Sequence, residues 1–121
     1  MKRDVWVKQL FQSIDDKNAD SFVTFLSDNV FFQFGNAEPV RGKLAVGDAV
    51  SGFFGSIMAL RHNVTETLET PGTMICHGTV AYTRHDSSIL RVPFANIFKL
   101  DEDVITDYLI YVDVSELYKS T

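Results

Sequence analysis

The chain has 121 residues, of which 45% are hydrophobic and 12% aromatic, so we expect a single domain over residues 1–121 with a substantial core. Sixteen acidic and eleven basic residues give a net charge of −5, which disfavours nucleic acid and anionic membranes as partners. One cysteine excludes an internal disulfide, and no zinc-like spacing of Cys and His occurs, so no metal or other cofactor is expected. Without an apolar leader or membrane span, a cytoplasmic protein is predicted.

The first half of the chain has helical periodicity. Val7, Leu10 and Phe11 recur at helical spacing, which predicts an amphipathic helix. We expect Asp15 and Asp16, which follow it, to be a solvated helix end. The elements predicted for this half are helices over residues 3–14 and 19–26, a strand over 30–34, a loop over 35–42 and a long apolar helix over 44–60.

The second half is predicted to be a sheet. Apolar and polar residues alternate along it, and short polar or Pro-Gly segments interrupt the alternation. Helices followed by an antiparallel meander indicate an α+β fold rather than a doubly wound sheet. The strands are predicted over residues 61–69, 73–85, 88–100 and 104–114.

One polar residue interrupts the apolar face of the third of these strands. Residues 89–100 read ILRVPFANIFKL, and every second position from Leu90 to Leu100 is apolar except Asn96. Burying an amide without partners costs about 1–3 kcal/mol. Asn96 is therefore either a structural residue that the protein satisfies or a residue that points into a binding site.

The order of elements is similar to the SnoaL-like branch of the nuclear transport factor two-like superfamily. The F-G-N-x-x-P-V-x-G loop and the Y-x-D-x-S ending carry the resemblance most strongly. It implies a cystatin-like α+β barrel, in which a curved, mostly antiparallel sheet wraps as a cone around the long helix, with two further helices at the N-terminus. Relatives include ketosteroid isomerase, limonene epoxide hydrolase, scytalone dehydratase and polyketide cyclases.

The catalytic residues of two of these relatives are not retained. The positions of the base, the oxyanion-binding tyrosine and the protonated acid of ketosteroid isomerase match Phe34, Leu10 and Asn96. The Asp-Arg-Asp arrangement of the epoxide hydrolase is absent as well. The resemblance therefore implies the fold and a pocket at the wide end of the cone, but neither of these two mechanisms.

Strand register suggests which polar residues share the pocket with Asn96. Depending on which two residues form the turn near residue 87, His77 or Thr79 lies opposite Asn96, and the odd residues of that strand face inward. The preceding turn sets Glu66 opposite His77. A carboxylate beside an imidazole orients it for proton transfer.

The predicted catalytic residues are His77 as the proton shuttle, Glu66 as its partner and Asn96 as the hydrogen-bond donor to a carbonyl or oxyanion. Each has a structural alternative, such as Asn96 bonded only to backbone. For His62 a rim or capping role is the alternative to a place in the site. The predicted substrate-binding residues are Trp6, Phe32, Phe34, Phe54, Met58, His62, Thr79, Phe94, Tyr108 and Ile110.

We expect a small, largely apolar molecule as the ligand, with acid–base chemistry of the isomerase, dehydratase or cyclase type. The alternatives are a non-catalytic binding module and a structural or interaction domain without a ligand. The outer face of the sheet predicts a homodimer, because its apolar patch is too large for a monomer. Lone Cys76 is expected on that face, and the patch comprises Val80, Tyr82, Pro93, Ala95, Ile97, Leu109 and Tyr111.

Overall fold

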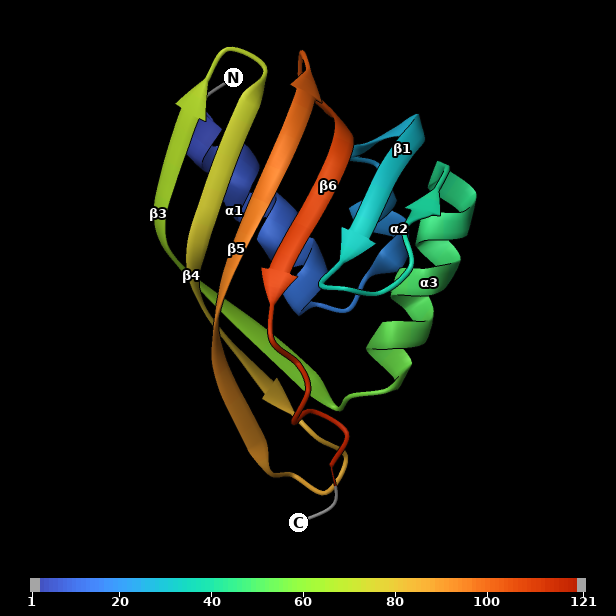
Figure 1. The fold of residues 1–121 in the computed structure, drawn as a ribbon, viewed down its shortest axis with the longest axis vertical. Coiled ribbons are helices and arrows are strands. Elements are labelled where there is room, and N and C mark those ends of the chain that lie inside the picture. The colour runs from blue at the N-terminus through green and yellow to red at the C-terminus, as the bar shows by residue number, and fades with distance from the viewer. Residues whose placement is uncertain (1–2, 120–121) are drawn as a thin grey trace.

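The computed structural model describes residues 3–119, and its element order confirms the predicted α+β class (Figure 1). No helix within this range has the length and apolar character needed to cross a membrane. In chain order the elements are α1 (Arg3–Asp15), α2 (Ala19–Val23), β1 (Leu26–Phe34), β2 (Val40–Arg41), α3 (Lys43–Gly55), β3 (Ala59–Thr70), β4 (Thr73–Thr83), β5 (Ile89–Asp101) and β6 (Val104–Val112).

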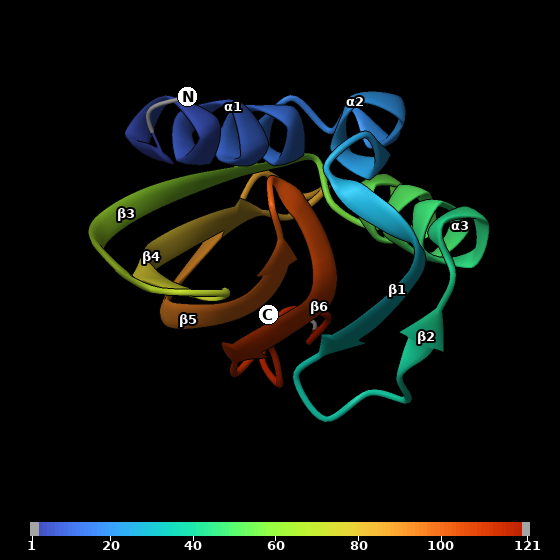
Figure 2. The same ribbon diagram turned by 90° about the horizontal axis from the view of Figure 1, so that it is seen from above.

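The strands form one strongly curled sheet in the order β2-β1-β6-β5-β4-β3. Only the β1–β6 pair is parallel, and the other neighbours are antiparallel. The curl leaves β3 and β2 as open edges, and α1, α2 and α3 cover the concave side between them (Figure 2). The hydrophobic core lies between this concave face and the helices.

The long helix ends earlier than the sequence predicts. It stops at Gly55 rather than at residue 60, and the Lys17 Nζ donates hydrogen bonds of 3.0 Å to the carbonyls of Ile57 and Met58. These bonds hold the chain in a non-helical turn that leads into β3. The second helix is also shorter than predicted, because residue 26 begins β1, and the predicted loop over residues 35–42 contains β2.

The register between β4 and β5 differs from the prediction. Cys76 pairs with Asn96, and His77 pairs with Ala95. The connecting loop has three residues and ends at Ser87, whose φ of 74° is left-handed, a common three-residue hairpin geometry. Because side chains alternate with period two, a loop of three residues instead of two exchanges the two faces of β4. The predicted inward position of His77 is therefore wrong.

The same exchange of faces moves three residues that the sequence places on the outer face of β4 into the interior. Cys76, Val80 and Tyr82 are each at most 3% exposed and pack in the core. Burial raises the pKa of the Cys76 thiol. The outer face of β4 instead carries odd-numbered residues.

A β-bulge in β3 brings two backbones into close contact. The register between β3 and β4 shifts between Val64 and Glu66, and the Asn63 carbonyl lies directly over Gly78. A Cβ at Gly78 would overlap the Asn63 oxygen and lie 2.8 Å from the Thr65 nitrogen. Glycine is therefore required here for space rather than for its backbone angles.

We predict opposite effects for two glycine substitutions. Gly78→Ala should lower the free energy of unfolding by at least about 1–3 kcal/mol, because backbone must move to admit the methyl group. Gly52→Ala in α3, where a Cβ meets nothing within 4 Å, should raise it by about 0.5–1 kcal/mol. Urea denaturation measures both, and a neutral Gly78→Ala would contradict the close approach at the bulge.

Candidate functional site

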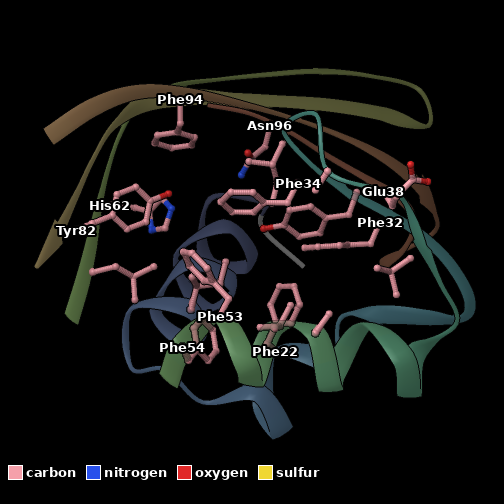
Figure 3. A pocket seen from close by; sticks show the side chains of 18 residues that line it. Phe22, Phe32, Phe34, Glu38, Phe53, Phe54, His62, Tyr82, Phe94 and Asn96 are labelled. Atoms are coloured by element: carbon pink, nitrogen blue, oxygen red, sulfur yellow. The ribbon is translucent and has the colours of Figure 1, made fainter. Parts of the chain in front are cut away.

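A cavity of about 250 Å³ lies between the concave face of the sheet and the helices (Figure 3). Strands supply one wall and α2 and α3 the other. None of the described residues that line it is Lys or Arg, and an apolar cavity with a few polar groups is typical of a small-molecule site. Its aromatic lining residues are Phe22, Phe32, Phe34, Phe53, Phe54, Tyr82, Phe94 and Tyr108.

Asn96 is the polar group of the sheet wall. It is 2% exposed, and its side-chain nitrogen is directed into the cavity in Figure 3. Its Oδ1 is buried and has no hydrogen-bond partner among the described residues. A buried amide oxygen without a partner costs about 1–3 kcal/mol. The protein therefore keeps an amide in this wall at the expense of stability.

His62 is the second polar group of the cavity, and Asp15 at the end of α1 holds it. The Asp15 carboxylate accepts two hydrogen bonds, from the backbone nitrogen of His62 at 3.0 Å and from its Nδ1 at 2.7 Å. The side chain of His62 is 10% exposed and that of Asp15 is 20% exposed. Because an ionised carboxylate only accepts, Nδ1 carries a proton, and in the neutral form of the ring Nε2 is the nitrogen with the lone pair.

Aromatic rings fix the plane of the imidazole. The ring centroid of His62 lies 5.0 Å from that of Phe94, edge to face, and 5.0 Å from that of Phe11. The Asp15 carboxylate and these two phenylalanine rings together leave the imidazole little freedom to rotate. A pre-positioned imidazole with a carboxylate partner is the arrangement that general acid–base catalysis requires.

Two tyrosines and the exposed Glu38 complete the polar inventory of the cavity. Burial raises the pKa of both Tyr82 and Tyr108 far above the usual range, with a smaller contribution from Tyr118 for Tyr82. Both hydroxyls therefore stay neutral at physiological pH. Within residues 3–119, no three His, Cys, Asp or Glu side chains come together as metal ligands.

The structure brings most of the sequence-predicted site residues to this cavity. Asn96 lines the cavity from the inner face of β5, where the sequence places it. His62 also lines the cavity, and its hydrogen-bond partner is Asp15. The predicted residues that line the cavity are Phe32, Phe34, Phe54, His62, Phe94, Asn96, Tyr108 and Ile110.

The predicted shuttle lies elsewhere. His77 and Glu66 do pair, with 2.8 Å between Nε2 and Oε1, but their side chains are 42% and 54% exposed on the outside of the sheet. Thr79 also faces outward, opposite Pro93. The remaining two predicted contacts lie outside the cavity lining, because Trp6 is a core residue packed on Phe25 and Phe98, and Met58 is 45% exposed.

Sequence reasoning missed Asp15 and Tyr82. Asp15 appears in the sequence as one of two acidic residues at a helix end, a pattern that is normally solvated. Only the fold shows that the end of α1 meets the start of β3. Tyr82 was assigned to the wrong face with the rest of β4. A test of hairpin loops of three residues, as well as two, would have identified it.

The fold is that of an α+β domain with a strongly curled sheet, and the cavity lies on the concave side of this sheet. The family model of the SnoaL-like domain matches residues 7–108, so the chain belongs to the SnoaL-like family. This confirms the resemblance inferred from the sequence. No curated protein shows significant sequence similarity.

Solved structures share the fold at low sequence identity. An epoxide hydrolase of the LEH-like type from M. tuberculosis has a TM-score of 0.78 at 14% identity, covering 93% of this chain and 84% of that one. A putative SnoaL-like polyketide cyclase from Jannaschia sp. CCS1 gives 0.80 at 12% identity, covering 93% and 85%. A hypothetical protein with a ketosteroid isomerase-like fold from Catenulispora acidiphila DSM 44928, in complex with trimethylamine, gives 0.84 at 12% identity, covering 91% of this chain and 86% of that one.

Proposed function

We propose that the cavity binds a small, largely apolar molecule bearing a carbonyl or hydroxyl oxygen, and that His62 transfers a proton to or from it. The observation that carries the proposal is the Asp15–His62 pair, which is held by two hydrogen bonds at the wall of an aromatic cavity that also contains Asn96. A merely structural core has little reason to keep both groups.

The lining favours neutral ligands with an acceptor atom. Aromatic side chains contact the apolar body, and the Asn96 Nδ2 donates to the oxygen. Carboxylates and phosphates fit poorly, because the described lining offers no Lys or Arg to replace their lost hydration. The ligand class is therefore a small ketone, enone or alcohol rather than an organic acid.

The proton chemistry follows from the tautomer of His62. Nε2 takes a proton from the carbon next to a carbonyl, the C–H electron pair forms the C=C bond of an enolate, and the carbonyl oxygen takes up the negative charge. Asn96 donates to that oxygen as the charge develops, and Asp15 stabilises the imidazolium. Return of the proton to another carbon isomerises the molecule, whereas its transfer from Nε2 to a β-hydroxyl releases water and leaves a C=C bond, which dehydrates the molecule.

The names of structural relatives support chemistry on small organic molecules. A polyketide cyclase and an epoxide hydrolase share this fold. Their catalytic groups do not transfer to this chain at such low identity, because functional sites evolve independently of folds. What supports the role of His62 is its own geometry.

We predict that the protein accelerates exchange of the α-hydrogens of cyclohexanone for deuterium in D₂O, followed by ¹H NMR. His62→Gln should slow the catalysed exchange by about 10²-fold or more, since it removes the base. Asp15→Asn should slow it too, because an amide cannot accept both hydrogen bonds from His62.

His77→Gln is the matched control, since His77 also pairs with a carboxylate but lies outside the cavity. The His77→Gln variant should catalyse exchange of the α-hydrogens of cyclohexanone at the wild-type rate. Equal losses for the two histidine variants, or no loss in His62→Gln, would refute the assignment of the base. Cyclohexanone binding without exchange in any variant would leave a non-catalytic binding module as the function.

We also propose a homodimer through the outer face of the sheet. In the observed β4–β5 register, the odd-numbered residues of β4 contribute to this face. Ile75, Ile97 and Leu109 are cross-strand neighbours on this face, and Tyr111, which is 54% exposed, extends the patch beside Ala95. A contiguous apolar surface of this kind is normally covered in solution.

Sedimentation velocity at micromolar concentration should show a dimer that Ile97→Asp converts to a monomer, because the charge would be buried in the interface. Leu44→Asp is the control, since Leu44 is 86% exposed on α3 and away from this face. A wild-type monomer, or a dimer that Ile97→Asp leaves intact, would contradict the interface.

A further inference from the structure

Tyr82 is a polar residue of the cavity that the proton transfer does not use. It is 3% exposed and lines the cavity from β4. Its ring packs edge to face on Phe53 of α3, with 5.9 Å between the ring centroids. Its hydroxyl has no hydrogen-bond partner among the described residues, and the nearby Tyr118 hydroxyl pairs with Ser56 at 2.8 Å. Buried polar groups are normally paired, so this hydroxyl is available to a ligand.

The strand register places Tyr82 next to His62 on the concave face of the sheet. His62 on β3 pairs with Val80, and Tyr82 follows two residues later on the same face of β4. Diagonal neighbours of this kind are within reach of aromatic side chains. Figure 3 shows the two side chains together at one end of the cavity, with the tyrosine oxygen directed into it. The candidate base therefore has a hydroxyl group beside it.

The register also gives the order of three polar groups along the concave face. Asn96 on β5 lies opposite Cys76. His62 lies opposite Val80, and Tyr82 is the next inward residue of β4. The imidazole is therefore between the amide and the hydroxyl in this order. A ligand with its carbonyl oxygen at the amide and the adjacent carbon at the imidazole extends its next carbon toward the hydroxyl.

We propose that the Tyr82 hydroxyl donates a hydrogen bond to a second oxygen of the ligand, carried on the carbon β to the carbonyl, and that the ligand is a small β-hydroxy ketone. This inference rests on the proposed function, because the position of the second oxygen is counted from the carbon that His62 deprotonates. Burial raises the pKa of the Tyr82 hydroxyl, which therefore donates a hydrogen bond and keeps its proton.

The reaction of such a ligand is loss of water. Nε2 of His62 takes the α-proton, and the C–H electron pair forms an enolate whose oxygen accepts a hydrogen bond from Asn96. The enolate pair then forms the C=C bond between the α- and β-carbons as the C–O bond breaks. The departing oxygen keeps the electron pair of that bond, accepts a hydrogen bond from Tyr82 and takes the proton from Nε2. The products are an enone and water, and His62 is neutral again.

The test compares the dissociation constants of cyclohexanone and 3-hydroxycyclohexanone, measured by ¹H–¹⁵N NMR titration. The His62→Gln background is used, because it cannot take the α-proton and so leaves the hydroxy ketone intact. Tyr82→Phe should lower the preference for 3-hydroxycyclohexanone over cyclohexanone about fivefold, since it removes one hydrogen bond and little volume. An unchanged preference, or an equal loss of affinity for both ligands, would overturn the role of Tyr82.

Two controls separate this role from a general effect on the cavity. Tyr108→Phe removes the other tyrosine hydroxyl of the cavity, on β6 opposite Phe98, and should leave the preference within about twofold. 4-Hydroxycyclohexanone carries its hydroxyl one carbon further from the carbonyl, and Tyr82→Phe should change its affinity by less than about twofold. A loss of preference in Tyr108→Phe as large as that in Tyr82→Phe would overturn the assignment. Equal losses for the two hydroxy ketones would overturn the β position.

A structural role for the Tyr82 hydroxyl predicts a different result. Because Tyr82→Phe removes an unpaired buried hydroxyl, its urea midpoint without ligand should equal or exceed that of the wild type. A lower midpoint would show that the hydroxyl stabilises the fold and would overturn its retention for a ligand. Failure of the protein to exchange the α-hydrogens of cyclohexanone would remove the proposed proton transfer, whereas the affinities still decide whether Tyr82 binds a second oxygen.

Discussion

The three-residue loop between β4 and β5 is the constraint on which the site depends. It pairs Cys76 with Asn96 and so fixes which of the two faces of β4 turns inward. Side chains alternate along a strand, and a register one residue different would bring His77 inside and push Tyr82 out. The cavity would then hold a second imidazole and lose one of its neutral hydroxyls. The side chains that β4 contributes to the site are thus set by the length of one turn.

The two polar groups of the cavity are supported differently. His62 receives its partner from the protein, because Asp15 accepts hydrogen bonds from both its ring and its backbone. Asn96 receives none for its Oδ1. A protein that satisfies one buried polar group and leaves the Oδ1 of the other unpaired keeps that amide at the expense of stability, which is characteristic of functional sites. Asp15 also joins the end of α1 to β3, so the same carboxylate fixes both fold and site.

Much of the fold could be read from the sequence. Periodicities of 3.6 and two residues located the helices and strands, and the alternation in β5 placed Asn96 inside with Phe94 and Phe98. The pairing of Glu66 with His77 was also predicted correctly. What failed depended on long-range contacts. The turn after α3 is held by Lys17, which is distant in sequence, and the face of β4 is set by a loop length that composition does not specify.

The candidate base could not be predicted for the same reason. His62 pairs with a residue 47 positions away, and nothing in the local sequence distinguishes Asp15 from Asp16. Only the packing of α1 against the edge of the sheet separates a solvated carboxylate from one that orients an imidazole. The aromatic wall was easier to predict, because residues such as Phe32 and Phe34 face inward by strand alternation alone.

We infer that Asn96 is retained for a ligand at the expense of stability. Urea denaturation of wild type and Asn96→Leu, with and without cyclohexanone, tests both halves in one measurement. Without ligand, Asn96→Leu should be more stable by about 1–3 kcal/mol, since it removes an unpaired buried amide. Its stabilisation by cyclohexanone should correspond to about tenfold weaker binding, the value of one hydrogen bond. An Asn96→Leu variant that is less stable than wild type, or one that binds cyclohexanone as tightly as wild type does, would contradict this role of Asn96.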